Sequence, residues 1–232
     1  PATVSVTVEP VNDAPSFTAG ADQSVDEDAG AQSVSGWATE FSAGPANEDG
    51  QGLSFAVSSD NGALFSAGPA VAADGTLTYT PAADANGSAQ VTVSLQDDGG
   101  TANGGSDTSA EQSFTITVEA ANDAPTVAAG LSAQSATEDQ SFSYTIPDDA
   151  FSDVDSGDTL SYAASGLPEG LALSSGTVSG TPSNAAVGSH TVTVTATDGS
   201  GATASTDFTL DVANTNDAPT VAAGLSAQSA TE

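Results

Sequence analysis

Apolar and polar side chains alternate with a period of two in short runs along most of the chain. In residues 91–95 and 114–118, for example, every second residue is apolar and the residues between them carry hydroxyl groups. This alternation predicts β-strands with one face in a core and the other in solvent. No run has the period of an α-helix, so the pattern predicts an all-β protein.

The runs form two series, in which turn signals such as Asp74-Gly75 and Asn86-Gly87 separate the strands. In the first series we expect strands at 31–37, 53–58, 76–80, 89–95 and 112–118. In the second series we expect them at 142–146, 159–164, 171–173, 177–179, 190–197 and 204–212. Six or seven short antiparallel strands at this spacing predict a Greek-key β-sandwich for each series.

The tetrapeptide Asn-Asp-Ala-Pro occurs three times, at 12–15, 122–125 and 216–219, and each copy follows a strand-like run. The copies are a whole domain apart, which is too far for the repeats of a solenoid. Residues 122–138 are also identical to residues 216–232. We therefore expect residues 1–13 to be the last strand and linker of a preceding repeat, with complete domains at 14–121 and 122–215. Residues 216–232 would begin a further repeat.

The chain has 31 acidic residues and no Lys or Arg, which gives a formal net charge of -31. Nucleic-acid binding then has no electrostatic basis, and an anionic membrane surface would repel the chain. Internal ion pairs can involve only His190 or the N-terminus. Solvent, salt or bound cations must relieve the carboxylate repulsion, so adaptation to salty water and metal binding remain compatible readings. Cys is absent, so disulfides do not stabilise the fold.

The densest candidate for metal chemistry is the run Asp153-Val154-Asp155-Ser156-Gly157-Asp158. Hard cations such as Ca²⁺ bind six to eight oxygens from carboxylates, amides and backbone carbonyls. In a loop, Asp153 and Asp155 can point to the same side, and Gly157 permits the turn that brings a later oxygen round. The run is not an EF-hand, because no Glu follows at the twelfth position and no helices flank it. Taken alone, such a loop is more often simply solvated.

Four motifs cover most of the second domain, residues 122–215: FSDVDSGDTLSY at 151–162, GLPEGL at 166–171, GTVSGTP at 176–182 and TATDG at 195–199. These motifs resemble those of the dystroglycan-type cadherin-like domain, also called the "putative immunoglobulin" domain, of large bacterial surface proteins. The resemblance implies a cadherin-like or immunoglobulin-like β-sandwich. The first domain is similar, more loosely, to cadherin-like tandem repeats of bacterial surface proteins, through TLTYTP at 76–81 and its Asn-Asp-Ala-Pro ends.

The cadherin resemblance implies a Ca²⁺ site at the junction 118–125. Carried over residue by residue, its ligands would be Glu27, Asn122, Asp123, Asp153, Asp155, Asp198, and Asp158 through its backbone. The junction at 8–15 lacks a preceding Glu, and Ala46 and Glu48 stand where the Asp-x-Asp pattern is expected. The linkers also depart from the cadherin pattern, because their last position is Ala rather than Asn. We therefore expect fewer ions per junction than the three of cadherins, and affinities near 10⁻⁴ to 10⁻³ M.

These features together predict calcium-stiffened extender repeats of a secreted or surface-anchored bacterial adhesin, with neighbouring repeats of the same chain as partners. The alternative is a Ca²⁺-dependent module that binds carbohydrate or associates with copies of itself, within a secreted polysaccharide-processing protein. Exposed aromatic rings in a groove would favour that alternative, and buried rings would favour the extender. We do not expect an enzyme, because the chain has one His and no cationic group to stabilise an oxyanion.

Overall fold

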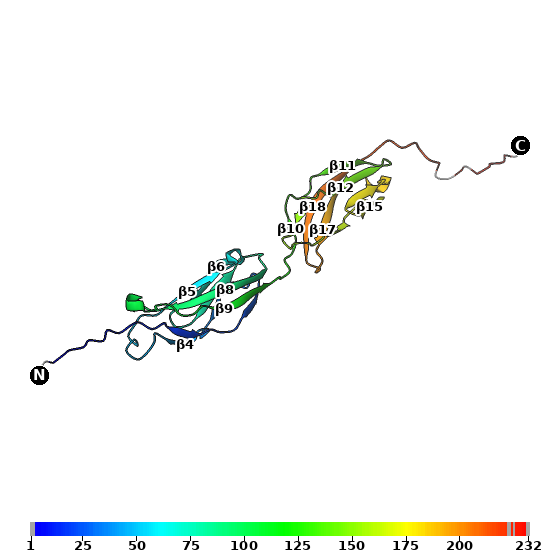
Figure 1. The fold of residues 1–232 in the computed structure, drawn as a ribbon. Coiled ribbons are helices and arrows are strands. Elements are labelled where there is room, and N and C mark those ends of the chain that lie inside the picture. Colours follow the sequence, from blue (N-terminus) through cyan, green and yellow to red (C-terminus); the bar gives the residue numbers. More distant parts are fainter. Residues whose placement is uncertain (1–2, 222–223, 225, 231–232) are drawn as a thin grey trace. The chain divides into compact units, whose positions relative to one another are not determined.

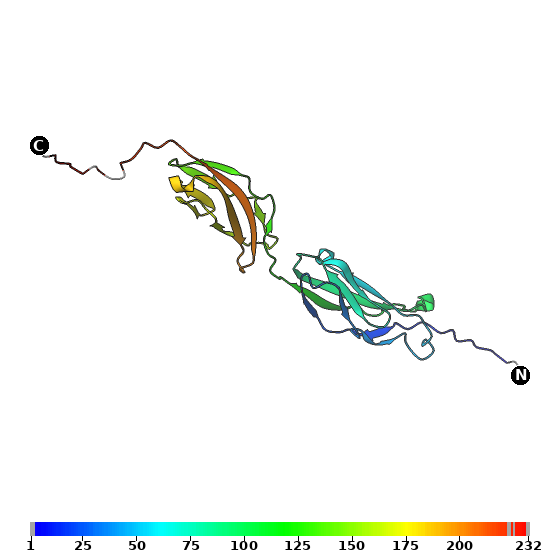
Figure 2. The same ribbon diagram turned by 180° about the vertical axis from the view of Figure 1, so that it is seen from behind.

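The computed structural model describes residues 3–221, 224 and 226–230. The chain divides into two compact units, Pro1–Ala121 and Asn122–Glu232, called unit 1 and unit 2. Figures 1 and 2 show the strands of each unit from opposite sides. The parts of the expected terminal segments at 1–2, 222–223, 225 and 231–232 lie outside the described residues.

Unit 1 is built from two main sheets that enclose one core. The first has the order β2 (Gln23–Asp26), β9 (Gln112–Glu119), β8 (Gly87–Gln96), β5 (Ser54–Ser59). The second has the order β3 (Gln32–Val34), β7 (Leu77–Pro81), β6 (Phe65–Val71). A further pair joins β1 (Ser16–Thr18) to β4 (Thr39–Ser42), and two short 3₁₀ turns lie at Gly62–Leu64 and Ala102–Gly104.

Unit 2 repeats this plan strand for strand. Its first sheet has the order β11 (Gln134–Thr137), β18 (Thr203–Ala213), β17 (Gly188–Thr197), β14 (Ser161–Ser165). Its second has the order β12 (Phe142–Thr145), β16 (Thr177–Gly180), β15 (Leu171–Ser174). The small pair is β10 (Thr126–Val127) with β13 (Phe151–Ser152), and a 3₁₀ turn lies at Asn184–Ala186. Both units are therefore β-sandwiches, as the sequence predicts.

The alternating residues of the long strands fill the two cores. In unit 1, Val91, Val93 and Leu95 of β8 are fully buried, and the hydroxyl-bearing residues between them are not. Trp37 is 3% exposed, lies 4.3 Å from the Phe114 ring and donates its indole N–H to the Ala21 carbonyl. In unit 2, Val192, Val194 and Ala196 of β17 pack with Phe208 and Leu210 of β18. The period-two pattern thus places the core side chains.

The prediction that all the strands are antiparallel is wrong at one place in each unit. Strand β2 runs parallel to β9, and β11 runs parallel to β18. Both short strands follow the linker and add to the sheet edge through backbone hydrogen bonds, which depend little on side-chain pattern. Strand β2 therefore escapes detection within the acidic run 22–28, and β11 within a run of Ser, Ala, Gln and Thr.

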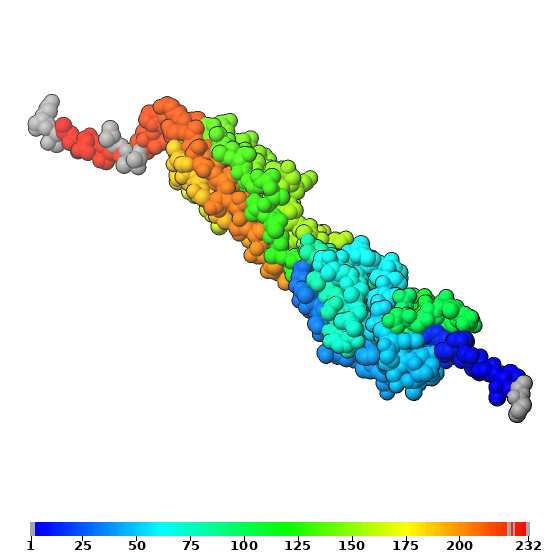
Figure 3. Space-filling view, turned by 90° about the vertical axis from the view of Figure 1, so that its left-hand side faces the viewer, coloured from blue at the N-terminus to red at the C-terminus, as the bar shows by residue number. Residues whose placement is uncertain are grey.

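The ends of the sequence-predicted elements also differ from the structure. The strand expected at 31–37 ends at Val34, because turns follow and Trp37 enters the core. The segment 3–8 forms no strand, and Val4, Val6 and Val8 are at least 80% exposed. In the space-filling view this segment, in dark blue, projects from the body of unit 1 (Figure 3). Its apolar residues lack a sheet to cover them.

Candidate metal centre

Three segments of unit 2 that are distant in sequence meet around a group of carboxylates. The first is the linker residue pair Asn122 and Asp123, and the second is the loop 153–158, which directly follows β13. The third is Asp198, directly after the last residue of β17. Because strands fix where these loops begin, the sandwich holds the acidic side chains at one end of the unit.

Asp198 is the best-anchored member of the group. Its side chain is 6% exposed, and its Oδ1 accepts backbone N–H bonds from Ser200, Gly201 and Ala202 at 2.9, 2.6 and 2.8 Å. Its Oδ2 accepts a 3.0 Å bond from Asn122 Nδ2. The Asn122 bond, together with the three backbone donors, holds the pKa of the Asp198 carboxyl below its ordinary value, and burial opposes them. Asp198 is therefore an ionised carboxylate fixed by its own turn.

The loop 153–158 divides its carboxylates between two tasks. Asp153 Oδ1 accepts the backbone N–H of Asp155 at 3.0 Å, which closes a local turn. Asp155 Oδ2 instead accepts the backbone N–H of Asp123 at 2.8 Å and so ties the linker to the loop. Gly157 has φ of 101°, a conformation that favours glycine, and the chain then turns back to Asp158.

Asp153, Asp158 and Asp198 form the unit 2 cluster. Each offers one carboxylate oxygen, and these three atoms lie within 4.8 Å of one another. Asp153 Oδ2 is shielded from solvent and has no hydrogen-bond partner in the described part of the chain. Asp158 Oδ2 receives only a long 3.4 Å bond from Gly199 N–H. Converging, partly unsatisfied carboxylates are the donor set that a hard divalent cation such as Ca²⁺ requires.

The structure thus brings most of the sequence-predicted ligands together within unit 2, with one difference. The cadherin resemblance implies a backbone ligand from Asp158, whereas in the structure its carboxylate reaches the cluster. Asn122, Asp123 and Asp155 surround the cluster through the bonds given above. The loop turn at Gly157 is the sequence signal that accounts for the approach of the Asp158 side chain.

Glu27, the ligand predicted from unit 1, lies at the end of β2 and is 3% exposed. Its Oε1 accepts the Ala121 N–H at 2.9 Å, and its Oε2 accepts Asn86 Nδ2 at 3.4 Å. The sequence predicts Asn86 only as a turn residue, because its side-chain bond to Glu27 joins positions that are distant in sequence. That Glu27 shares a metal with residues of unit 2 remains a prediction.

Unit 2 repeats the Glu27 arrangement at Glu138, which is fully buried. Glu138 Oε1 accepts bonds from Asn214 Nδ2 at 2.7 Å and from Thr215 N–H at 2.5 Å. Its Oε2 is shielded and has no partner among the described residues. Each unit therefore buries one glutamate against the chain that leaves its last strand.

Among the described residues, no helix has the length and apolar character needed to cross a membrane.

Two family models match the chain, one for each unit. Residues 12–117 match the family described as "Bacterial Ig domain", and residues 124–213 match the family described as "Putative Ig domain". Among curated proteins, no sequence matches the chain. Ig-like and cadherin-like domains are typically extracellular and non-catalytic.

Cadherin structures resemble the chain in fold. Domains 22–24 of mouse cadherin-23 match with a TM-score of 0.56 and 18% identity over 88% of this chain and 66% of that one. Domains 1–4 of protocadherin gamma B7 match with a TM-score of 0.51 and 19% identity over 88% of this chain and 52% of that one.

An endo-fucoidan hydrolase of glycoside hydrolase family 107 also matches, with 17% identity over 90% of this chain and 30% of that one. Its TM-score of 0.36 is too low to show a common fold. The chain spans 30% of the hydrolase, 52% of the protocadherin structure and 66% of the cadherin-23 structure, so it matches only a part of each. Each unit thus matches a family model of Ig domains, and its fold is the β-sandwich that the cadherin structures share.

Proposed function

We propose that the chain is a pair of calcium-stiffened extender repeats from a secreted or cell-surface bacterial adhesin, serving cell adhesion. The observation that carries the proposal is the unit 2 cluster, in which three carboxylate oxygens lie within 4.8 Å of one another. The chain has no Lys or Arg to neutralise them. Repulsion between converging carboxylates is relieved when a divalent cation binds.

In this proposal Ca²⁺ binds Asp153, Asp158 and Asp198, with Asn122, Asp123 and Asp155 completing or orienting the site. Glu27 would add a ligand from unit 1, as the cadherin resemblance implies. When bound, Ca²⁺ supplies positive charge and coordination bonds. Asp155 and Asp198 hold the linker through the Asp123 N–H and the Asn122 amide, so order at the cluster is transmitted directly to the linker.

Neighbouring repeats are then the principal partners, and the stiffened linkers would project a distal binding domain away from the cell. The carbohydrate-binding alternative finds no support at Trp37 and Tyr79, which are each 3% exposed and offer no ring face to a sugar. Its remaining candidates are Phe41, which is 37% exposed, and the half-buried Tyr162, which lines a pocket of unit 2.

Small-angle X-ray scattering with chelator and with about 1 mM Ca²⁺, near the weak end of extracellular calcium sites, tests the proposal. Ca²⁺ should narrow the distribution of interdomain distances in the parent chain and leave the Asp153→Ala/Asp155→Ala variant unchanged. Asp207→Asn, an exposed position in the middle of β18, is the matched charge control and should behave as the parent. Scattering of the parent that does not respond to Ca²⁺ would overturn the stiffening role.

Isothermal titration calorimetry on the same three proteins separates binding from stiffening. Heat of Ca²⁺ binding without a change in scattering would retain the metal site and reject its mechanical role. If neither heat of binding nor a change in scattering were observed, the acidic residues would serve solubility alone. A pull-down with polysaccharide would then be the next experiment.

A further inference from the structure

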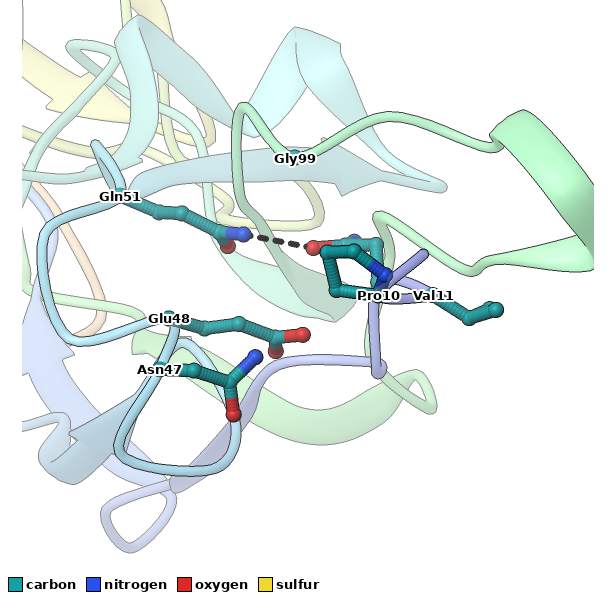
Figure 4. A pocket seen from close by; sticks show the side chains of 7 residues that line it. Pro10, Val11, Asn47, Glu48, Gln51 and Gly99 are labelled. Carbon is teal, nitrogen blue, oxygen red and sulfur yellow. Dashed lines mark hydrogen bonds between the residues drawn. The ribbon is translucent and has the colours of Figure 1, made fainter. Parts of the chain in front are cut away.

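Each unit has a pocket on its surface, and the two pockets differ in size and lining. In unit 1, a pocket of about 160 Å³ lies beside Glu48 and Gln51, and Gln51 Nε2 donates a 2.7 Å bond to Asn12 Oδ1, the dashed line in Figure 4. In unit 2, a pocket of about 430 Å³ lies beside β14, and this volume is typical of small-ligand sites. We call it the β14 pocket.

Three segments of unit 2 line the β14 pocket: the start of β14, the turn before β13 and the hairpin turn between β15 and β16. Their residues are Leu160, Ser161 and Tyr162, then Asp148, then Ser175 and Gly176. Leu160 and Tyr162 are half-buried and offer apolar surface. Asp148, Ser161 and Ser175 are exposed and offer oxygen atoms. The pocket therefore joins an apolar wall to a polar rim.

The hairpin turn leaves this space open. Gly176 has φ of 74°, and a side chain there would lie 3.8 Å from Tyr162 Cδ2, an ordinary contact distance. Its carbonyl accepts the Ile146 N–H at 2.9 Å. In unit 1 the matching glycine is Gly75, whose carbonyl accepts the Ala38 N–H at 3.0 Å, and a side chain there would collide with the Ala38 carbonyl. The open space at this turn is therefore a feature of unit 2 that the shared plan does not require.

Ser175 is a second unusual feature of the same turn. Its φ is 47°, in the left-handed region, where two-residue hairpin turns favour Asn, Asp or Gly. Strained residues of this kind gather at ligand sites. The Ser175 hydroxyl lies at the rim of the pocket and has no hydrogen-bond partner in the described part of the chain.

The charge of the lining favours a cation. The Asp148 carboxylate accepts no hydrogen bond among the described residues, and Ser161 donates its hydroxyl to the Thr197 carbonyl at 3.2 Å, which leaves its oxygen free to accept. The sequence has 31 acidic residues and no Lys or Arg, so no basic side chain of the chain neutralises Asp148 or the adjacent Asp149. A neutral ligand gains nothing from this field, whereas a cation is attracted by it.

An arginine side chain matches the lining group by group. A guanidinium has five N–H donors and no acceptor, pairs with carboxylates and stacks on aromatic rings, and the methylenes behind it cover apolar surface. Asp148 would pair with the guanidinium, Tyr162 would stack on it, and Leu160 would contact the methylenes. A hydrated metal ion would leave both apolar side chains without a role.

Strand β14 suits an arginine that is carried by an extended peptide. It is the outer strand of its sheet, and its backbone pairs only with β17 among the described strands. An outer strand presents unpaired N–H and C=O groups, to which an extended peptide can add. Because the sequence has no Arg, a second copy of these two units cannot supply the side chain.

We propose that the β14 pocket binds an arginine side chain of a partner protein, presented on an extended basic segment that lies along the edge of β14. This site goes beyond the proposed function, which concerns Ca²⁺ and the linker. It makes unit 2 a docking surface as well as a spacer.

The test is a titration of the ¹⁵N-labelled chain, followed by its NMR amide signals at about 1 mM Ca²⁺ and about 0.15 M salt, which screens distant charges. The probe is a short blocked peptide of Ser and Thr with one central Arg. In the control peptide citrulline replaces Arg, which keeps the shape and removes the charge. The Arg peptide should shift the signals of residues 148, 160–162 and 175–176, and the citrulline peptide should bind about tenfold more weakly.

Asp148→Asn should weaken binding of the Arg peptide by about fivefold, the upper end for an exposed ion pair. Asp149→Asn makes the same change at the next residue of the same turn, which does not line the pocket, and should keep the parental affinity. Trp37, the one Trp of the sequence, lies in the core of unit 1, so its fluorescence reports that unit alone and should not respond to the peptide.

Equal binding of the two peptides, equal losses in the two variants, or signal shifts spread over the other acidic residues would overturn the proposal. A neutral oligosaccharide that shifts the pocket signals when the Arg peptide does not would also reject it, and would assign the pocket to a sugar.

Discussion

The linker end of unit 1, where the segment 10–13 passes the loop 45–51, and the unit 2 cluster are two versions of one arrangement. In each, a linker asparagine donates its side-chain amide to the aspartate that ends the penultimate strand, as Asn12 does to Asp97 and Asn122 to Asp198. In each, the next linker residue donates its backbone N–H to a carboxylate of the loop before the outer strand of the first sheet, β5 in unit 1 and β14 in unit 2. Asp13 donates to Glu48, and Asp123 donates to Asp155.

The two units differ in the side chains that this shared backbone arrangement carries. Unit 2 has aspartates at 153 and 158, whereas unit 1 has Ala46 at the position of the first and a Gln51 amide nearby. Both units keep the backbone contacts that hold the linker, but unit 1 has fewer carboxylates at this end than unit 2. A common fold therefore fixes where ligands stand, and the individual side chains decide how strongly each end attracts a cation.

The largest effect expected is the loss of one unit without the other. Phe208→Ala removes a ring that is 4% exposed and lies 5.3 Å from the Tyr144 ring in unit 2. Large-to-small changes of this kind cost about 3–5 kcal/mol, a large part of the stability of a small domain. In chelator, circular dichroism should show early unfolding of unit 2 while the Trp37 fluorescence midpoint stays at the parental value.

Val187→Ala, at a position 39% exposed, is the control within unit 2 and should change little. If Phe208→Ala lowered the Trp37 unfolding midpoint together with the stability of unit 2, the two units would unfold as one even without metal. They could then not be compared as independent domains.

An intermediate effect is expected from giving unit 1 the carboxylate that it lacks. Ala46→Asp places an aspartate at the exposed position that corresponds to Asp153 in the sequence pattern. A carboxylate added to the loop of Glu48 should raise the affinity of this end of unit 1 for Ca²⁺ by about tenfold, or roughly 1.4 kcal/mol. Trp37 unfolding midpoints at graded Ca²⁺ measure this change. Ala110→Asp adds the same charge at another exposed site and should not tighten Ca²⁺ binding. If both variants gained the same affinity, the effect would come from the added negative charge and not from its position.

The smallest effect concerns acid. The pKa of Asp198 is lower in the folded chain than its ordinary value of 3.8, chiefly because of the Asn122 bond. Such a carboxyl stabilises the fold above its unfolded pKa, and this contribution is lost as the pH falls through the lower folded value. In chelator, unit 2 should therefore lose stability below about pH 4, as followed by NMR amide signals of β17. Asp198→Asn should remove this part of the pH dependence; an identical acid profile would contradict the assignment.

The parts of the fold that follow from sequence are those where side chains decide the outcome. Strands β8, β9, β17 and β18 bury alternate residues, so their pattern predicts both their place and their inward face. Strands β2 and β11 escape because backbone hydrogen bonds at a sheet edge define them. The small pairs β1–β4 and β10–β13 are too short to show a period.

The candidate sites divide in the same way. The run 153–158 reveals its acidic residues and its glycine turn, but not that Asp155 binds the linker while the Asp158 carboxylate joins Asp153 and Asp198. The role of Glu48 could not be predicted, because its burial depends on Gly44 and on the distant Asp13 N–H. Side-chain direction and long-range partners are tertiary properties, which a local pattern does not contain.

The parallel pairing of β11 with β18 has a consequence for how unit 2 would respond to tension. Its four-residue ladder joins Gln134 to Leu210 at one end and Thr137 to Ala213 at the other. A pull on the chain before β11 and after β18 acts in opposite directions along two strands that run the same way. The load then shears the rungs together instead of opening them one by one. The same geometry, β2 against β9, would make these two strands a mechanical clamp in unit 1.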